Sequence, residues 1–108
     1  MIKIIVFKDC TNQYKGFDIS GHAGYDAYGK DIICSAVSVL SQNAVNSIES
    51  FTKDKFNVNI EQSGDLWFRF IGNISRESIL LLDSMILGFS SVREAYGSQY
   101  IEVLFEEV

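Results

Sequence analysis

Two side chains near the start of this sequence could perform nucleophilic chemistry together. His22 is the one histidine among the 108 residues, and Cys34 follows it after a segment that contains Gly24 and Gly29. A cysteine nucleophile with a histidine base is the minimal pair for acyl transfer. The spacing alone is weak evidence, because a cysteine is most often a small apolar side chain without a chemical role. The pair is therefore a hypothesis that depends on the elements around it.

The start of a predicted helix distinguishes Cys34 from the other cysteine. From Asp31 the apolar residues recur every three to four positions, which predicts a helix that runs to about Phe51. With Asp31 as the N-cap, Cys34 lies in the first turn at N3, where free N–H groups and the positive end of the helix dipole favour a thiolate. The same N–H groups could bind the oxyanion of a tetrahedral intermediate. Cys10 follows a predicted strand and lacks this environment, so Cys34 is the expected nucleophile.

Four neighbouring residues each have two interpretations. Asp31 either orients His22 or only caps the helix, and capping is expected because Asp is a preferred N-cap. Ser38 lies one turn after Cys34, where its hydroxyl either hydrogen-bonds near the nucleophile or, by default, to the Cys34 carbonyl. Gly24 and Gly29 are either hinges of a lid or turn glycines with positive φ.

The periodicity of the chain predicts an α+β fold. Strands are expected at 2–8, 14–21, 56–61, 65–71 and 100–105, a loop at 22–30, and helices at 31–51 and 75–97. The first two strands and the next two form hairpins, the second around the turn Gln62-Ser63-Gly64. This order predicts a single domain over 1–108, with one five-stranded, mostly antiparallel or mixed sheet and two helices packed on it. The second helix is apolar over a wide arc, so either the core or a second subunit covers it on more than one side.

The composition argues against several classes of function. A net charge of −5 disfavours non-specific binding to nucleic acid and favours a basic partner. The sequence shows neither a signal peptide nor an apolar run long enough for a membrane span, so we expect a cytoplasmic protein with reduced cysteines. One histidine and two distant cysteines do not match the spacing of a zinc site, and we expect neither a metal nor a cofactor.

The segments SGHAGY at 20–25 and GKDIICSAVS at 29–38 closely resemble the ribosomal-processing cysteine protease Prp family. The resemblance implies a catalytic dyad carried by His22 and Cys34. It also implies a homodimer and an endopeptidase that removes a short N-terminal extension from large-subunit ribosomal protein 27. We expect Asp31, Ser38 and Gly21 to support the dyad, and the resemblance implies a mobile loop over the site, which would contain Gly24, Tyr25 and Gly29.

Two other classes of function remain open at the level of sequence. One is a non-enzymatic, ribosome-associated binding protein in which His22 and Cys34 are structural, so that alanine at either position leaves function intact. The other is a thiol redox sensor that forms a reversible disulfide between Cys10 and Cys34, although these residues lack the C-x-x-C spacing.

Overall fold

A computed structural model of the chain describes residues 1–27 and 29–108, so residue 28 of the predicted 22–30 loop lies outside the described residues. The seven predicted elements are present in the predicted order. They are β1 (Ile2–Lys8), β2 (Tyr14–Ser20), α1 (Ile32–Phe51), β3 (Lys55–Ile60), β4 (Leu66–Ile71), α2 (Arg76–Tyr96) and β5 (Ile101–Glu107).

Four of the five strands have boundaries that differ from the sequence-based prediction. β3 covers Lys55–Ile60 rather than 56–61, and β4 begins at Leu66 rather than at residue 65, because the pairing of the two strands runs from Lys55 opposite Ile71 to Ile60 opposite Leu66. β2 ends at Ser20 rather than at residue 21, because Gly21 adopts a φ of 85° and turns the chain out of the sheet. β5 covers Ile101–Glu107 rather than 100–105, because it pairs residue for residue with the whole of β1, from Ile2 opposite Ile101 to Lys8 opposite Glu107.

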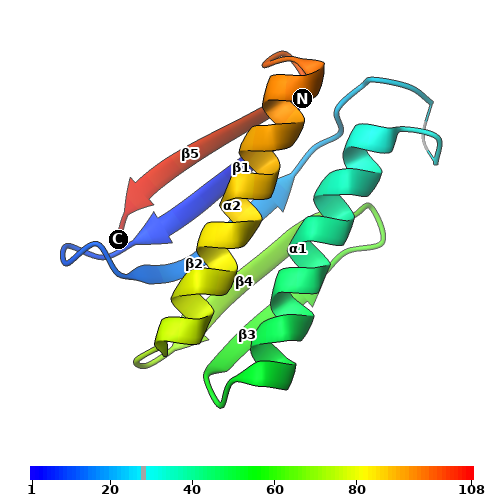
Figure 1. Cartoon of the computed structure of the whole chain (residues 1–108). Coiled ribbons are helices and arrows are strands. Elements are labelled where there is room, and N and C mark those ends of the chain that lie inside the picture. Colours follow the sequence, from blue (N-terminus) through cyan, green and yellow to red (C-terminus); the bar gives the residue numbers. More distant parts are fainter. Residues whose placement is uncertain (28) are drawn as a thin grey trace.

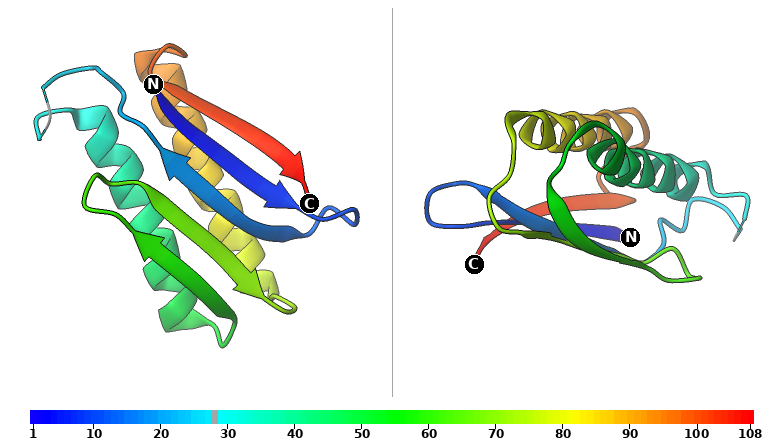
Figure 2. Two further views of the ribbon diagram at one scale, coloured as in Figure 1. Left: turned by 180° about the vertical axis from the view of Figure 1, so that it is seen from behind. Right: turned by 90° about the horizontal axis from the view of Figure 1, so that it is seen from below.

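The strands form one mixed sheet in the order β3-β4-β2-β1-β5. β1 and β5 are parallel, whereas the other neighbouring pairs are antiparallel. Both helices lie on one face of the sheet, and the opposite face is open (Figures 1 and 2). The predicted fold class is confirmed. The pairing of β2 with β4 matters most for the site, because it places the β3–β4 turn beside the end of β2.

The core lies between the sheet and the two helices. Phe68 of β4 is buried and stacks on Phe17 and Phe56, with ring centroids 5.0 and 4.9 Å apart. The predicted apolar stripe of α1 faces this core, with Ile33 and Ile48 buried at its two ends. Because both ends of the stripe are packed, the first turn of α1 is held firmly over the sheet.

The helix termini follow from local sequence. Asp31 and Ser75 are the N-caps of α1 and α2, and Gly97 ends α2 with a φ of 120°. Within the described residues, neither α1 nor α2 combines the length and the apolar character needed to cross a membrane.

Candidate active site

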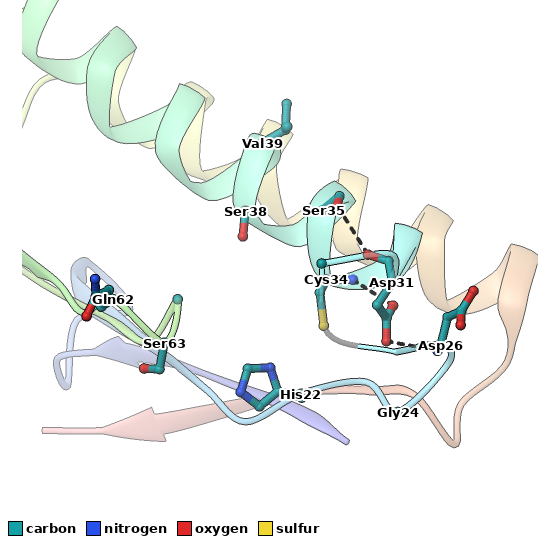
Figure 3. Close-up of a pocket in the computed structure, with 12 residues that line it drawn as sticks. His22, Gly24, Asp26, Asp31, Cys34, Ser35, Ser38, Val39, Gln62 and Ser63 are labelled. Atoms are coloured by element: carbon teal, nitrogen blue, oxygen red, sulfur yellow. Dashed lines mark hydrogen bonds between the residues drawn. The ribbon is translucent and has the colours of Figure 1, made fainter.

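The loop between β2 and α1 brings His22 and Cys34 to one cavity. His22 lies two residues beyond β2, and Cys34 is the third residue of α1, so it occupies N3 as the sequence predicts. Both line an open cavity of about 570 Å³. The Cys34 side chain points from α1 toward the space that the His22 imidazole also faces (Figure 3). The other lining residues are Gly24, Asp26, Gly29, Asp31, Ser35, Ser38, Val39, Gln62, Ser63 and Gly64.

The buried carboxylate of Asp31 joins the loop to the helix. Its Oδ1 accepts the N–H groups of Ile33 at 3.0 Å and Cys34 at 3.1 Å, which is the expected N-cap arrangement. Its Oδ2 accepts the N–H groups of Tyr25 at 2.9 Å and Asp26 at 3.4 Å. Capping of the helix by Asp31 is therefore confirmed, and the same carboxylate also holds the loop.

The hydrogen bonds of Asp31 favour its ionised form. Burial by itself raises the pKa of this carboxyl, but the backbone N–H groups of Cys34, Tyr25, Asp26 and Ile33 outweigh burial and hold the pKa below its usual value. Asp31 is thus a charged acceptor bound on both sides by backbone donors.

The same contacts occupy the donors of the first helical turn. The N–H groups of Ile33 and Cys34 donate to Asp31 Oδ1, and Ser35 donates its N–H to the Asp31 carbonyl at 3.1 Å. An oxyanion would have to compete with a carboxylate for the first two. The expectation that these N–H groups bind the oxyanion is therefore not favoured by this arrangement.

A different backbone donor faces the sulfur atom. The N–H of Ala23, the residue after His22, points to Cys34 Sγ with an N···S distance of 3.4 Å. Ala23 is buried, whereas Cys34 is half-buried and accessible from the cavity. This contact ties the segment after β2 to the first turn of α1.

The chain matches the model of a known protein family over nearly its whole length. The model of a family described as cysteine protease Prp matches residues 1–102. The chain belongs to this family. It is therefore a cysteine protease, and the non-enzymatic interpretation of its histidine and cysteine is disfavoured.

Named relatives agree with the family assignment. The ribosomal processing cysteine protease Prp of Staphylococcus aureus (strain Mu50 / ATCC 700699) is 28% identical over 80 residues, which are 73% of this chain and 76% of that protein. The protein of the same name from Bacillus subtilis (strain 168) is 24% identical over 101 residues, covering 89% of this chain and 90% of the relative.

Solved structures share the fold. The Staphylococcus aureus Prp protease with a covalently linked product peptide has a TM-score of 0.90 at 23% identity, over 98% of this chain and all (100%) of that chain. The same protease with a substrate peptide has a TM-score of 0.85 at 22% identity, over 98% and 100% of the two chains.

Two glycines of the loop in this Prp-family protease take turn conformations. Gly24 and Gly29 have φ values of 71° and 85°, so both are turn glycines, and their role as hinges stays a prediction. The Tyr25 ring packs edge-on against Tyr96 and Tyr100, with centroids 5.7 and 5.3 Å apart. This contact ties the loop to the end of α2 and the start of β5.

Ser38 lies on the cavity wall, one turn after Cys34, and its hydroxyl points into the cavity in Figure 3. A hydrogen bond from this hydroxyl to the Cys34 carbonyl is not found among the described residues. Ser41 makes such a bond, to the Val37 carbonyl at 2.8 Å. The geometry therefore favours the interpretation in which Ser38 faces the nucleophile.

The predicted β3–β4 turn forms the cavity wall opposite α1 with its residues Gln62-Ser63-Gly64. The sequence alone did not reveal that this turn belongs to the site. It was identified as a turn, but its closeness to His22 depends on the long-range pairing of β2 with β4. The same pairing brings Asp65 to Gly21, whose N–H donates to Asp65 Oδ1 at 3.2 Å. For the contact between Asp65 and Gly21, the sequence offered no signal beyond an acidic residue that follows an exposed polar turn.

The geometry disfavours the redox alternative. Cys10 lies beyond the end of β1, whereas Cys34 lies beside Ala23 at the opposite end of the hairpin. The seven residues of β2 separate these ends by about 20 Å, much more than the roughly 7 Å between Cα atoms that a disulfide allows. Among the described residues, no group of three or more His, Cys, Asp or Glu side chains could hold a metal ion.

Proposed function

We propose that this protease removes the short N-terminal extension of large-subunit ribosomal protein 27, with Cys34 as the nucleophile and His22 as the general base and acid. One observation carries the assignment of the two residues. His22 and Cys34 come from different elements, yet both line the same open cavity, and Ala23 links the loop to the sulfur atom. A peptide that enters this cavity can therefore reach both the thiol and the imidazole.

The chemistry follows the usual course of a cysteine protease. His22 takes the thiol proton, and the Cys34 sulfur attacks the scissile carbonyl carbon. When the tetrahedral intermediate collapses, the C–N bond breaks and His22 gives its proton to the leaving amine. Water then attacks the thioester with His22 as base, which releases the new carboxyl end and restores the thiol.

The Ala23 N–H is a suitable donor for the oxyanion in this mechanism. It already points to the attacking sulfur at 3.4 Å, and the developing oxyanion lies on the carbon bonded to that sulfur. The Ser38 hydroxyl on the cavity wall is a second donor on the α1 side. Neither group is engaged with Asp31, unlike the N–H groups of Ile33 and Cys34.

The substrate is supported by the relatives and by charge. The relatives from Staphylococcus aureus and Bacillus subtilis are named ribosomal processing proteases, and the former has been solved with a substrate peptide. A net charge of −5 attracts a basic ribosomal protein. Because ribosomal proteins are made and assembled in the cytoplasm, we propose that the enzyme works there.

A homodimer forms part of the same proposal. Leu80 and Leu87 of α2 are each 68% exposed and lie two turns apart, on one face of the helix. A second cavity of about 460 Å³ is hollowed beside Leu80 on this helix. Two exposed leucines on one helix face, next to a hollow lined partly by Arg76, Glu77 and Asp83, suit a second copy of the chain.

The test is incubation with the full-length ribosomal protein followed by mass spectrometry of the product. We expect a single loss of mass that corresponds to the N-terminal extension. Cys34→Ala and His22→Ala should abolish cleavage, Cys34→Ser should leave little, and Cys10→Ala should cleave like the wild type. Cleavage by Cys34→Ala, or an unchanged substrate with the wild type, would contradict the proposal.

A further inference from the structure

The β3–β4 hairpin is hydrogen-bonded to the residue immediately before His22. Gly21 donates its N–H to Asp65 Oδ1 at 3.2 Å, although the two residues lie 44 positions apart. At this point the chain has left β2, because Gly21 has a φ of 85°. A backbone carbonyl of the sheet would normally accept this N–H, and the Asp65 side chain takes that place.

Two backbone hydrogen bonds thus flank His22. On one side Gly21 binds Asp65 of the hairpin, and on the other Ala23 binds Cys34 Sγ of α1. The hairpin turn and the first turns of α1 also form the two facing walls of the cavity. The backbone on either side of His22 is therefore hydrogen-bonded to one of these two walls, and the imidazole extends from the residue between the two bonds.

Asp65 is itself held in a well-defined turn. Its carbonyl accepts the N–H of Glu61 at 2.8 Å, and its own N–H donates to Ser63 Oγ at 3.4 Å. The next residue, Leu66, is buried and pairs with both Ile19 of β2 and Ile60 of β3. The Asp65 carboxylate therefore reaches Gly21 from a backbone position that is held by the turn and by the start of β4.

We propose that Asp65 is a positioning residue, which fixes the backbone at Gly21 and so aims the His22 imidazole at Cys34. This inference rests on the proposed roles of His22 and Cys34. It concerns the hydrogen bond to Gly21 rather than the negative charge of the carboxylate. A small displacement of a general base is costly, because proton transfer requires hydrogen-bond geometry in the transition state.

Three substitutions separate the hydrogen bond from the charge. Asp65→Ala removes both, and Asp65→Asn keeps an acceptor oxygen at the same place without the charge. Asp65→Glu keeps the charge but moves the acceptor by one methylene group. Asp18→Ala is the matched control, because Asp18 is an aspartate of β2 that binds Arg69 at 2.7 Å on the open face of the sheet, away from the cavity.

Two measurements are made on each variant after its folding has been checked by circular dichroism. The first is kcat and KM for cleavage of the ribosomal protein. The second is the rate of Cys34 alkylation by iodoacetamide as a function of pH, in a Cys10→Ala background. The second measurement needs no substrate, so it tests Asp65 even if the wild type fails to cleave and the proposed function fails with it.

We expect Asp65→Ala to lower kcat by about tenfold to a hundredfold with little change in KM, and to move the onset of alkylation to higher pH. Asp65→Asn should recover most of the activity, Asp65→Glu little, and Asp18→Ala should match the wild type in both measurements. The proposal is overturned if Asp65→Ala behaves like the wild type, or if Glu recovers the activity and Asn does not. Should Asp65→Ala not fold, the comparison of Asn with Glu decides alone.

Discussion

At the scale of single residues, Asp31 determines how the loop and the helix meet. One carboxylate oxygen serves the first turn of α1 and the other serves the loop at Tyr25 and Asp26. An alanine at this position would leave buried backbone donors without partners, and unsatisfied donors are costly. The role of Asp31 is thus to hold the loop after β2 against the start of α1.

We expect Asp31→Ala to lower the free energy of unfolding by about 1–3 kcal/mol, from loss of the N-cap and of the loop contacts. Urea denaturation measures this change, with Asp26→Ala as the control, because Asp26 lies in the same loop and is exposed. An unfolding free energy equal to that of the wild type would show that the Asp31 hydrogen bonds contribute nothing measurable.

The stabilisation by Asp31 depends on pH in a defined direction. The folded-state pKa of this carboxyl lies below its usual value of about 3.9, so its contribution is complete above that value. The contribution is lost as pH falls from there through the folded-state pKa. The stability advantage of the wild type over Asp31→Asn should therefore shrink on acidification in urea denaturation series, and an advantage that grows would contradict the assignment.

Local sequence signals revealed much of the site at this scale. Asp31 was predicted as the N-cap and Cys34 as an N3 residue, because both depend on neighbours within one helical turn. Asp65 was not predicted as a site residue, because its contact with Gly21 depends on a partner 44 residues away. The Ala23 contact with Cys34 depends on how the loop folds back, which periodicity does not report.

At the scale of elements, the pairing of β2 with β4 builds the cavity. Periodicity and turn residues predicted each strand and the two hairpins, but not how the hairpins pair with each other or where the last strand lies, so the full order β3-β4-β2-β1-β5 was not predicted. Gly16 of β2 is the residue on which this pairing depends most directly. A Cβ atom at Gly16 would lie 2.1 Å from the Phe68 carbonyl oxygen of β4. This oxygen belongs to the backbone of β4, so it cannot move aside as the end of a flexible side chain could.

Gly16→Ala should therefore destabilise the protein by about 1–3 kcal/mol through overpacking between the two strands. The midpoint of urea unfolding measures the effect, and Lys15→Ala, at the neighbouring half-buried position of β2, is the matched control. Because the same pairing holds the hairpin beside His22, protease activity should fall at urea concentrations where the wild type is still active. An unchanged midpoint would mean that β2 and β4 can separate without loss of stability.

At the scale of the whole molecule, two surfaces could meet a second copy: the open face of the sheet and the outer face of α2 (Figure 2). The open sheet face is only partly covered within the chain, because Trp67, Ile71 and Leu104 on it are still 42%, 51% and 36% exposed. Arg69 stacks over Phe7 and Trp67, with its guanidinium 4.3 and 4.8 Å from their ring centroids, and it pairs with Asp18. Leu80 and Leu87 of α2 are each 68% exposed, more than Trp67 or Ile71, and on this ground we propose α2 rather than the sheet as the contact surface of a dimer.

This choice of interface can be tested by the mass of the protein in solution. We expect the wild type to sediment as a dimer, and the double variant Leu80→Glu, Leu87→Glu to sediment as a monomer, because four charges would be buried around the two-fold axis. Ile71→Glu is the matched control, since Ile71 is 51% exposed but belongs to β4 rather than to α2. A monomeric wild type would exclude the dimer. If Ile71→Glu dissociates while the α2 variant stays dimeric, the second copy covers the sheet, and the exposed leucines serve another purpose.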